Sequence, residues 1–242
     1  EQPASRTGAY PYARWAQQWP ARAFRFVVQN CVARPAMLIL AWPRIRGREN
    51  LRRVTGPVLV VSSHQTYLDP SYVLEALPGR LRRRLAVAMD GERLALMRHP
   101  APTTAFFAGL IDRMKYFLIV SIYNVFPLPR AAGFRKSFAF AGDLIDRGWS
   151  VLVFPEGELT RDGKIAPFRA GIGLLAARLK VPVVPMRLEG LYERRIANKS
   201  WAPPGTVHVT IGAPVRFDEN KAAEEIAREL ELQVAALSHV PQ

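Results

Sequence analysis

The sequence predicts an α/β fold with a mainly parallel central sheet that is flanked by helices. Residues 58–63 (VLVVSS) and 150–157 (SVLVFPEG) are short apolar runs rich in β-branched residues, which are typical of strands buried on both faces. Residues 133–148 carry apolar residues at helical spacing and end at a glycine. A strand at 124–129, this helix and the strand at 150–157 form a strand–helix–strand unit of about thirty residues. The two strands of such a unit should run parallel.

The remaining elements follow from the same criteria. A helix is expected from Asp69, because Asp69 suits the N-cap and Pro70 suits the first helical position. The two prolines within 124–129 place that strand at a sheet edge or a strand end. Residues 1–20 are expected to be irregular, and residues 46–57 to form a linker. Further strands are expected at 85–90, 181–188 and 206–212, and further helices at about 91–118, at 170–180 and from 218 onwards.

The length and composition describe a folded chain with one main domain. The sequence has 242 residues, of which 49% are hydrophobic and 22% are charged, and this suits a large buried core. We expect residues 1–43 to form an irregular and amphipathic N-terminal segment, and residues 44–242 to form the functional domain. The single cysteine, Cys31, excludes an internal disulfide framework, suits a reducing compartment and is expected to be buried.

The formal net charge of +14 is the strongest compositional feature. A surface this basic attracts polyanions, either nucleic acid or the anionic face of a membrane. The basic residues gather at 44–53, 80–84 and 192–196. These clusters are dispersed, and the sequence has no recognised nucleic-acid module, so nucleic acid is not an expected partner. An anionic membrane surface remains, beside the plainer alternative of a basic surface that is only solvated.

Residues 19–42 combine aromatic and apolar residues with arginines. Trp19, Phe24 and Val27 alternate with Arg22 and Arg25, which is typical of a helix in a membrane interface with its arginines turned outward. An amphipathic helix packed on the domain fits this pattern equally well. The sequence shows no secretory signal, and no uncharged apolar run reaches the ~18–20 residues of a spanning helix.

Chemically distinct polar side chains follow three of the predicted strands. His64 comes just after the first strand, Arg130 follows the proline-containing strand, and Glu156 and Gly157 end the next one. Ligands of parallel sheets gather at the carboxyl ends of the strands, so these groups should share one rim. A histidine can accept a hydroxyl proton while a carboxylate such as Asp69 fixes its tautomer, and an arginine can grip a phosphate. This set suits transfer to a phosphate-bearing alcohol.

Four sequence blocks carry these residues in order. The first is a His-x4-Asp spacing, the second ends in arginine, the third contains Phe-Pro-Glu-Gly, and the fourth reads Val-Pro-Val-Val-Pro. A single His-x4-Asp spacing arises in many proteins, whereas four blocks in order form a specific pattern. The blocks are Ser63–His64 with Asp69, then Asn124–Arg130, Phe154–Arg161 and Val181–Pro185.

This arrangement resembles the motifs of the glycerolipid acyltransferases, over about residues 44–237. The family pattern Asn-His-x4-Asp is kept except for Ser63, and Val-Pro-Val-Val-Pro is intact. In the second block, Asn124 replaces the glycine of Gly-x-x-Phe-x-x-Arg, and the phenylalanine comes one residue early. In the third block, Phe-Pro-Glu-Gly-Thr-Arg, two extra residues precede Thr160 and Arg161.

The resemblance implies an O-acyltransferase that moves a fatty acyl group from coenzyme A or acyl carrier protein to a hydroxyl of a lysophospholipid, such as 1-acylglycerol-3-phosphate. His64 would act as the general base and Asp69 would orient it. Attack would be direct, which agrees with the absence of a Gly-x-Ser-x-Gly nucleophile elbow from the sequence. No cofactor or metal is implied, and the acyl thioester is a co-substrate. Residues 44–242 would form the acyltransferase domain, peripheral or monotopic on the cytoplasmic face of the cell membrane.

Substrate binding is assigned by resemblance to four residues, Arg130, Glu156, Gly157 and Arg161. The two extra residues in the third block leave open whether Arg161, Lys164 or Arg169 completes the phosphate site. For Glu156, hydrogen bonding to neighbouring backbone amides is a plainer alternative. Residues 103–120 suit either the lining of an acyl-chain site or a plain core helix.

Two other functions remain to be weighed against this one. Residues 171–176 (GIGLLA) partly match a dinucleotide-binding fingerprint, but that motif works only directly after a strand. Its glycines more plainly permit close helix packing. A non-catalytic module that binds lipid phosphates would share the basic rim and the membrane affinity, but it would not need His64. The four histidines show no metal-ligand spacing.

Overall fold

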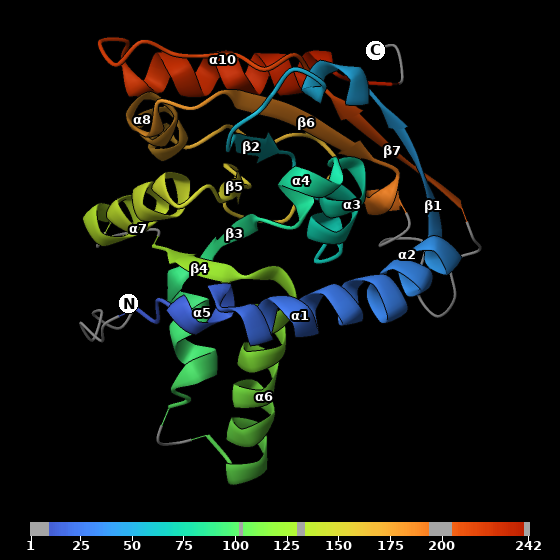
Figure 1. Cartoon of the computed structure of the whole chain (residues 1–242), viewed down its shortest axis with the longest axis vertical. Helices are drawn as coiled ribbons and strands as arrows, with labels where there is room; N and C mark the ends of the chain where they lie inside the picture. The colour runs from blue at the N-terminus through green and yellow to red at the C-terminus, as the bar shows by residue number, and fades with distance from the viewer. Residues whose placement is uncertain (1–9, 102–103, 130–133, 194–204, 240–242) are drawn as a thin grey trace.

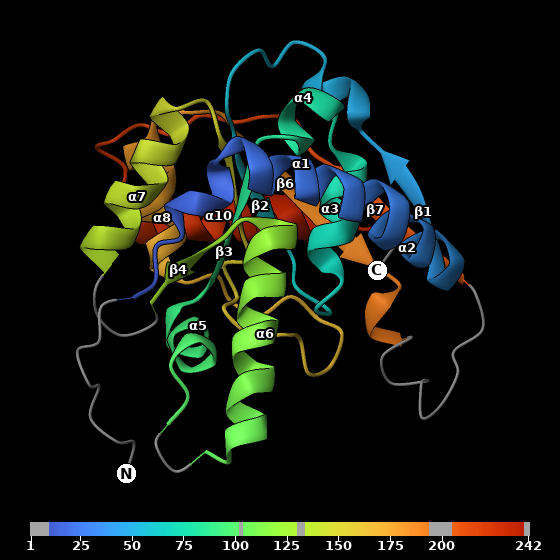
Figure 2. The ribbon, with the colours of Figure 1, turned by 60° about the horizontal axis from the view of Figure 1, so that its bottom comes forward.

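The computed structural model describes residues 10–101, 104–129, 134–193 and 205–239, which form one seven-stranded sheet with helices on both faces (Figures 1 and 2). The strand order is β1-β7-β6-β2-β5-β3-β4, and every neighbouring pair is parallel except β6 and β7. The predicted α/β fold with a mainly parallel sheet is therefore confirmed. The strands are β1 (Ala41–Arg46), β2 (Leu59–Ser62), β3 (Leu85–Asp90), β4 (Val125–Leu128), β5 (Ser150–Val153), β6 (Val183–Glu189) and β7 (Gly205–Ile211).

The two faces of the sheet carry different helices, because successive side chains of a strand point to opposite faces. Val60 of β2 packs with apolar side chains of α2 to α6, whereas Leu59 and Val61 pack with those of α7, α8 and α10. The helices are α1 (Trp19–Val28), α2 (Arg34–Leu40), α3 (Asp69–Ala76), α4 (Gly79–Arg82), α5 (Gly91–Arg98), α6 (Phe106–Tyr123), α7 (Phe134–Asp146), α8 (Ala170–Leu179) and α10 (Ala223–Ala236).

The sequence predicts one of the two edge strands of the sheet but not the other. The proline-containing run forms β4, which lies at one edge as expected and runs in the same direction as β5. The strand at the other edge, β1, has no counterpart among the predicted strands. Pro43 interrupts its apolar pattern, and an edge strand tolerates this because one side of its backbone needs no partner strand. β1 also crosses the expected boundary between residues 43 and 44.

One continuous helix runs from Trp19 to Leu40 and includes a π-helical stretch, Gln29–Ala33, between α1 and α2. Within the described part of the chain, it is the one helix long and apolar enough, by length and composition alone, to cross a membrane. Most of it is exposed. The expectation from uncharged runs missed this helix because its arginines lie inside the apolar stretch.

The orientation of this helix corrects two expectations. Arg25 is buried rather than turned outward: its Nε donates to the Ser121 carbonyl and its Nη2 to the Ala16 carbonyl, both at 2.8 Å. Burial, with a smaller contribution from the charge of Arg22, lowers the pKa of Arg25 to about 10. Cys31 was expected to be buried but is exposed. The face of the helix that carries Cys31 has no partner in the described chain, so an apolar setting in the sequence did not translate into burial.

The stretch expected to be either acyl-site lining or core, 103–120, is not core over most of its length, and its part in an acyl-chain site stays a prediction. Its described residues include most of α6, where Gly109, Tyr116 and Val120 are buried. Ile119 is partly buried, and the other large apolar side chains of this stretch are exposed. Figure 2 shows α6 projecting from the body of the molecule beside α5.

The glycines of the partial dinucleotide fingerprint lie inside α8, well beyond the end of β5, which rules out the phosphate-binding geometry of that motif. A Cβ on Gly173 would lie 1.9 Å from the carbonyl oxygen of Ala223 at the start of α10. Close helix packing therefore explains Gly173. It does not explain Gly171, where an added Cβ would meet no atom within 4 Å.

This contrast gives a test of the α8–α10 contact. Gly173→Ala should lower the free energy of unfolding by about 1–3 kcal/mol, because the backbones must move apart. Gly171→Ala is the matched control and should leave stability unchanged or raise it by up to ~1 kcal/mol through helix propensity. Urea unfolding followed by circular dichroism measures both. Equal stability of the two variants would contradict the packing role of Gly173.

Candidate active site

The loops after β2 and β5 meet at the carboxyl edge of the sheet. These strands are parallel neighbours with Val61 opposite Val153, so His64 and Glu156, each three residues further on, lie across from each other. The backbone amide of His64 donates to Oε1 of Glu156 at 2.7 Å. The predicted convergence of these two residues at one rim is therefore observed.

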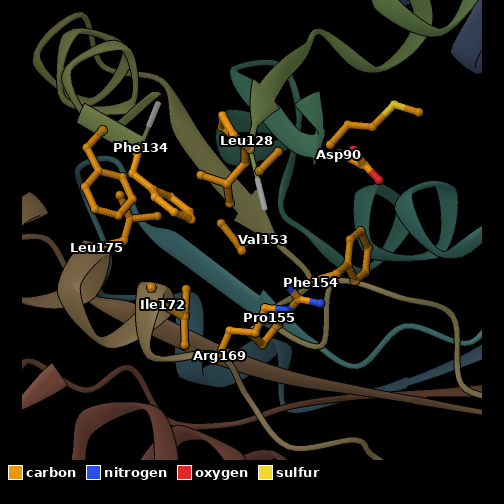
Figure 3. A pocket seen from close by; sticks show the side chains of 15 residues that line it. Asp90, Leu128, Phe134, Val153, Phe154, Pro155, Arg169, Ile172 and Leu175 are labelled. Atoms are coloured by element: carbon orange, nitrogen blue, oxygen red, sulfur yellow. The ribbon is translucent and has the colours of Figure 1, made fainter. Parts of the chain in front are cut away.

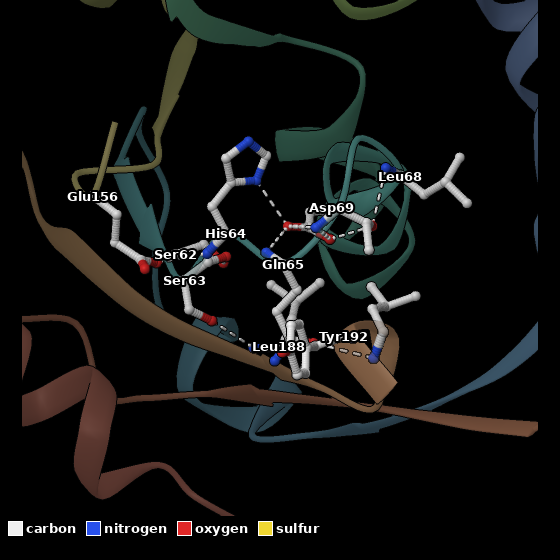
Figure 4. Close-up of polar contacts among 11 residues, drawn as sticks. Ser62, Ser63, His64, Gln65, Leu68, Asp69, Glu156, Leu188 and Tyr192 are labelled. Carbon is white, nitrogen blue, oxygen red and sulfur yellow. Dashed lines mark hydrogen bonds and ion pairs between the residues drawn. The ribbon is translucent and has the colours of Figure 1, made fainter. Parts of the chain in front are cut away.

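His64 and Asp69 form a hydrogen-bonded pair in this loop (Figure 4). Nδ1 of His64 lies 2.8 Å from Oδ2 of Asp69, and the Asp69 side chain is fully buried while His64 keeps 18% of its side chain exposed. The other ring nitrogen of His64 points away from Asp69 (Figure 4). Asp69 is therefore shielded from solvent, whereas part of the His64 side chain is accessible to it.

Every group around the Asp69 carboxylate is a hydrogen-bond donor. The backbone amides of Gln65 and Thr66 donate to it at 2.5 and 3.0 Å, and the Thr66 hydroxyl donates at 2.8 Å. The carboxylate oxygens accept all of these bonds, so Nδ1 of His64 carries the proton that it donates to Oδ2. Nε2 is then the basic nitrogen, on the exposed side of the ring.

Asp69 was expected to be the N-cap of the helix that it begins. The N-cap position is instead Leu68, and Asp69 is the first residue of α3. Its carboxylate turns back to the preceding loop and makes no capping bond to the helix. The negative charge still lies at a helix N-terminus, where the helix dipole favours it.

Further hydrogen bonds fix the loop that carries His64. The Ser63 hydroxyl accepts from the amide of Leu188 in β6 at 3.1 Å, and the His64 carbonyl accepts from the Thr160 amide at 2.9 Å. The Gln65 side-chain carbonyl accepts from the Leu191 amide at 3.1 Å. The loop is therefore tied on one side to β6 and on the other to the segment after β5.

Glu156 is buried and joins two loops. Its Oε1 accepts from His64 and its Oε2 accepts from the Ala166 amide at 2.9 Å. Burial raises the pKa of the Glu156 carboxyl, and these amide hydrogen bonds act in the opposite direction. The contacts are those of the plainer alternative considered for Glu156. Its assignment to substrate binding stays a prediction.

A cavity of about 200 Å³ opens at the carboxyl ends of β3, β4 and β5 (Figure 3). Phe154 forms part of its wall and also stacks on the His64 ring, with centroids 4.1 Å apart and planes at 20°. The sequence reasoning did not assign Phe154 to the site, although this residue begins the third block. Most of the lining is apolar and includes Leu128, Phe134, Phe138, Val153, Ile172 and Leu175.

The candidate cations of the phosphate site occupy different places. Arg130 lies outside the described residues. The Arg161 side chain is 89% exposed, pairs with Glu158 at 3.3 Å and is not part of the cavity wall. Arg169 does line the cavity, beside Phe154 (Figure 3). The binding role assigned to Arg161 stays a prediction.

The lack of a side chain at Gly157 leaves room for the Arg169 side chain. Its φ of +73° favours glycine, and a Cβ there would lie 2.8 Å from Nε of Arg169. That Nε donates to the Glu156 carbonyl at 3.4 Å. Among the described residues Arg169 forms no ion pair, so its charge has no anionic partner within this part of the chain.

The family model for acyltransferases matches residues 43–189, which is more than half of the 242-residue chain. The chain belongs to the acyltransferase family. The predicted resemblance is therefore confirmed, and the matched segment includes His64, Asp69 and Glu156.

Two relatives and one solved structure illustrate the similarity. A 1-acyl-sn-glycerol-3-phosphate acyltransferase of Pseudomonas aeruginosa is 31% identical over 220 residues, covering 86% of this chain and 74% of the relative. The chloroplastic BAT2 acyltransferase of Brassica napus is 30% identical over 147 residues, covering 60% of this chain and 37% of the relative. The crystal structure of PlsC from Thermotoga maritima has a TM-score of 0.60 at 20% identity, covering 91% of this chain and 83% of that one, and shows a shared fold. The chain spans about half the length, or less, of the plant and mammalian relatives that it matches.

The double contact of Glu156 predicts a stability effect for this acyltransferase-family chain. Glu156→Gln turns an amide NH₂ towards one of two backbone donors, so one hydrogen bond is lost and stability should fall by about 1–3 kcal/mol. Glu158→Gln, two residues away with a half-exposed side chain (48%), should change stability by less than about 0.5 kcal/mol. Thermal unfolding compares the two, and a similar loss in both would refute the loop-joining role of Glu156.

Proposed function

We propose that the chain is an O-acyltransferase that moves a fatty acyl group from an acyl thioester to a hydroxyl of a lysophospholipid such as 1-acylglycerol-3-phosphate. The observation that carries this proposal is the His64–Asp69 pair, whose free Nε2 lies at an open rim beside a mostly apolar cavity. The names of the relatives describe this reaction for those proteins.

His64 acts as a general base towards the acceptor hydroxyl. The hydroxyl proton passes to Nε2 while the oxygen attacks the thioester carbonyl carbon, and the buried Asp69 carboxylate stabilises the imidazolium that forms. The tetrahedral intermediate then expels the thiolate, and the imidazolium returns the proton to sulfur. The overall change is that the acyl group moves from the thioester sulfur to the acceptor oxygen, while the hydroxyl proton moves to the sulfur.

Acyl transfer is direct, without an acyl-enzyme. The two serines next to His64 are engaged elsewhere: the Ser62 hydroxyl donates to the Ser63 carbonyl, and the Ser63 hydroxyl accepts from Leu188. Both side chains are buried. A nucleophile needs its base within hydrogen-bond reach, and the polar partner of the His64 ring is Asp69.

Arg169 binds the phosphate of the acceptor from inside the cavity. Among the described residues its charge has no anionic partner, and it lines the same cavity as Phe154, the residue that stacks on His64. A phosphate held there keeps the rest of the acceptor within reach of Nε2. Arg130 is expected to share this role. The displaced position of Arg161 follows from the two extra residues before it in the third block.

The acyl donor is a thioester of coenzyme A or of acyl carrier protein, and no further cofactor is required for the proton transfer. The protein acts at the cytoplasmic face of the cell membrane, where the exposed helix Trp19–Leu40 and the net charge of +14 favour an anionic surface. Association there is peripheral or monotopic.

The catalytic assignment is tested by His64→Ala. Loss of a general base should lower thioester-dependent acylation by about 10²- to 10⁴-fold. Binding to anionic liposomes should stay unchanged, because the bilayer does not need the imidazole. His99→Ala, at an exposed histidine after α5, is the matched control and should keep full activity. Equal acylation by His64→Ala and wild type would favour the non-catalytic lipid-phosphate module.

The phosphate assignment is tested by Arg169→Ala beside Arg161→Ala. Loss of a charge-assisted hydrogen bond in the cavity should raise the acceptor KM by about ten- to a hundredfold for Arg169→Ala. The exposed Arg161, which already pairs with Glu158, should have little effect. A monoacylglycerol acceptor lacks the phosphate, so its KM should be the same in Arg169→Ala and wild type. An equal rise for both acceptors would contradict phosphate binding by Arg169.

A further inference from the structure

Helix α6 carries a large apolar surface between Phe106 and Leu118. Its members lie three or four positions apart on a helix, so they share neighbouring faces. Their exposed fractions run from 48% to 79%. Phe117, at one end of the surface, also contacts the ring of Trp15, with ring centroids 6.2 Å apart. The residues of this α6 apolar face are Phe106, Phe107, Leu110, Ile111, Met114, Phe117 and Leu118.

The α6 apolar face is connected to the catalytic loop through α5. Tyr67 and Leu68, between His64 and Asp69, are themselves exposed. Arg93 of α5 places its guanidinium 4.8 Å from the centre of the Tyr67 ring and donates to the Tyr67 hydroxyl at 2.8 Å. α5 also carries the exposed Leu96 and packs on α6, where Pro100 lies 3.6 Å from the Cβ position of Gly109.

The same helix is fixed to the N-terminal helix Trp19–Leu40. Arg25 donates to the Ser121 carbonyl, and the Gln29 side chain donates to the Ile122 carbonyl at 2.7 Å. Both bonds satisfy carbonyls in the last turn of α6, which a helix leaves without internal partners. The last turn of α6 is therefore joined to the N-terminal helix, and Figure 1 shows α6 meeting α1 at one end while the other end projects away.

We infer that the α6 apolar face inserts into the interfacial layer of an anionic bilayer and holds the His64 rim against the membrane. This inference rests on the proposed function and extends it to the way in which the enzyme meets its lipid. Apolar patches of this extent are rare on monomeric soluble proteins and mark a partner. α6 also carries the exposed cations Arg113 and Lys115, which can extend to phosphate headgroups while the apolar side chains enter the bilayer.

Charge favours a bilayer over a second copy of the chain. Each copy carries a net charge of +14, so two copies repel each other, whereas an anionic lipid surface attracts the same charge.

Fluorescence quenching tests the location of α6 directly, because the sequence has one cysteine. In a Cys31→Ser background, Leu110→Cys is labelled with bimane and mixed with phosphatidylglycerol-containing vesicles whose acyl chains are brominated. We expect strong quenching at this position. The matched control is Leu232→Cys on α10, equally apolar and 62% exposed, where no quenching is expected. Absent quenching at Leu110→Cys, or equal quenching at both sites, would overturn the inference.

Vesicle flotation gives a second measurement with the full chain. Phe107→Glu combined with Leu110→Glu should reduce the vesicle-bound fraction by about tenfold or more, since two carboxylates would have to enter the apolar layer. Leu232→Glu should float like the wild type. Both positions are exposed, so the variants should keep the circular dichroism spectrum of the wild type. Turnover of a short-chain, water-soluble lysophosphatidate should also be unchanged.

These readouts separate the inference from the proposed function. A wild-type chain that binds vesicles through α6 but transfers no acyl group would refute the acyltransferase proposal and leave the α6 result standing. Full flotation of the α6 double variant would refute the inference, whatever the activity. A change in sedimentation from dimer to monomer in that variant, with flotation unchanged, would assign the face to a second copy of the chain.

Discussion

The buried carboxylate of Asp69 is the constraint on which the site depends. A charge without solvent exposure must be matched by donors, and here an imidazole, two backbone amides and a hydroxyl supply them. Those donors come from three consecutive residues, 64–66, so satisfying one carboxylate also fixes the backbone of the loop. The same bonds choose the tautomer of His64. The hydrogen bonds that orient the His64 ring are therefore the same bonds that fold this loop, and a change in one alters the other.

The parallel sheet brings the second half of the site to this loop. Because β2 and β5 are adjacent and in register, Glu156 reaches the His64 amide without any unusual backbone path. The Glu156 carboxylate also accepts from the Ala166 amide. The Glu156 carbonyl, next to Gly157, accepts from Nε of Arg169. Two loops that are far apart in sequence become one rigid rim. The two contacts of Glu156 therefore account for a buried acid at this place.

Sequence reasoning could predict those features that are local or that follow from the order of strands. The central strands and the His64–Asp69 pair fall in this class, because a five-residue spacing at the end of a strand leaves little freedom. The places of Arg161 and Arg169 could not be predicted, since two extra residues redirect every following side chain. The sequence did not predict β1 because Pro43 interrupts its apolar pattern. Cys31 and α6 look like core in the sequence because apolar residues usually are core, and only the fold shows that nothing in the described chain covers them.

The uncovered surfaces and the covered site form a consistent whole. Residues of α7 and α8 line the cavity, while the other face of the sheet supports α1 and α6, several of whose aromatic side chains are exposed. In water alone this exposure would be a liability, and a net charge of +14 would have no counterpart. An apolar layer bounded by anionic headgroups resolves both at once. In the proposed reaction the same layer would also hold the acceptor, whose phosphate would reach Arg169 while its chain stays in the layer. The residues proposed to hold the protein at the membrane would then also shorten the path of the substrate.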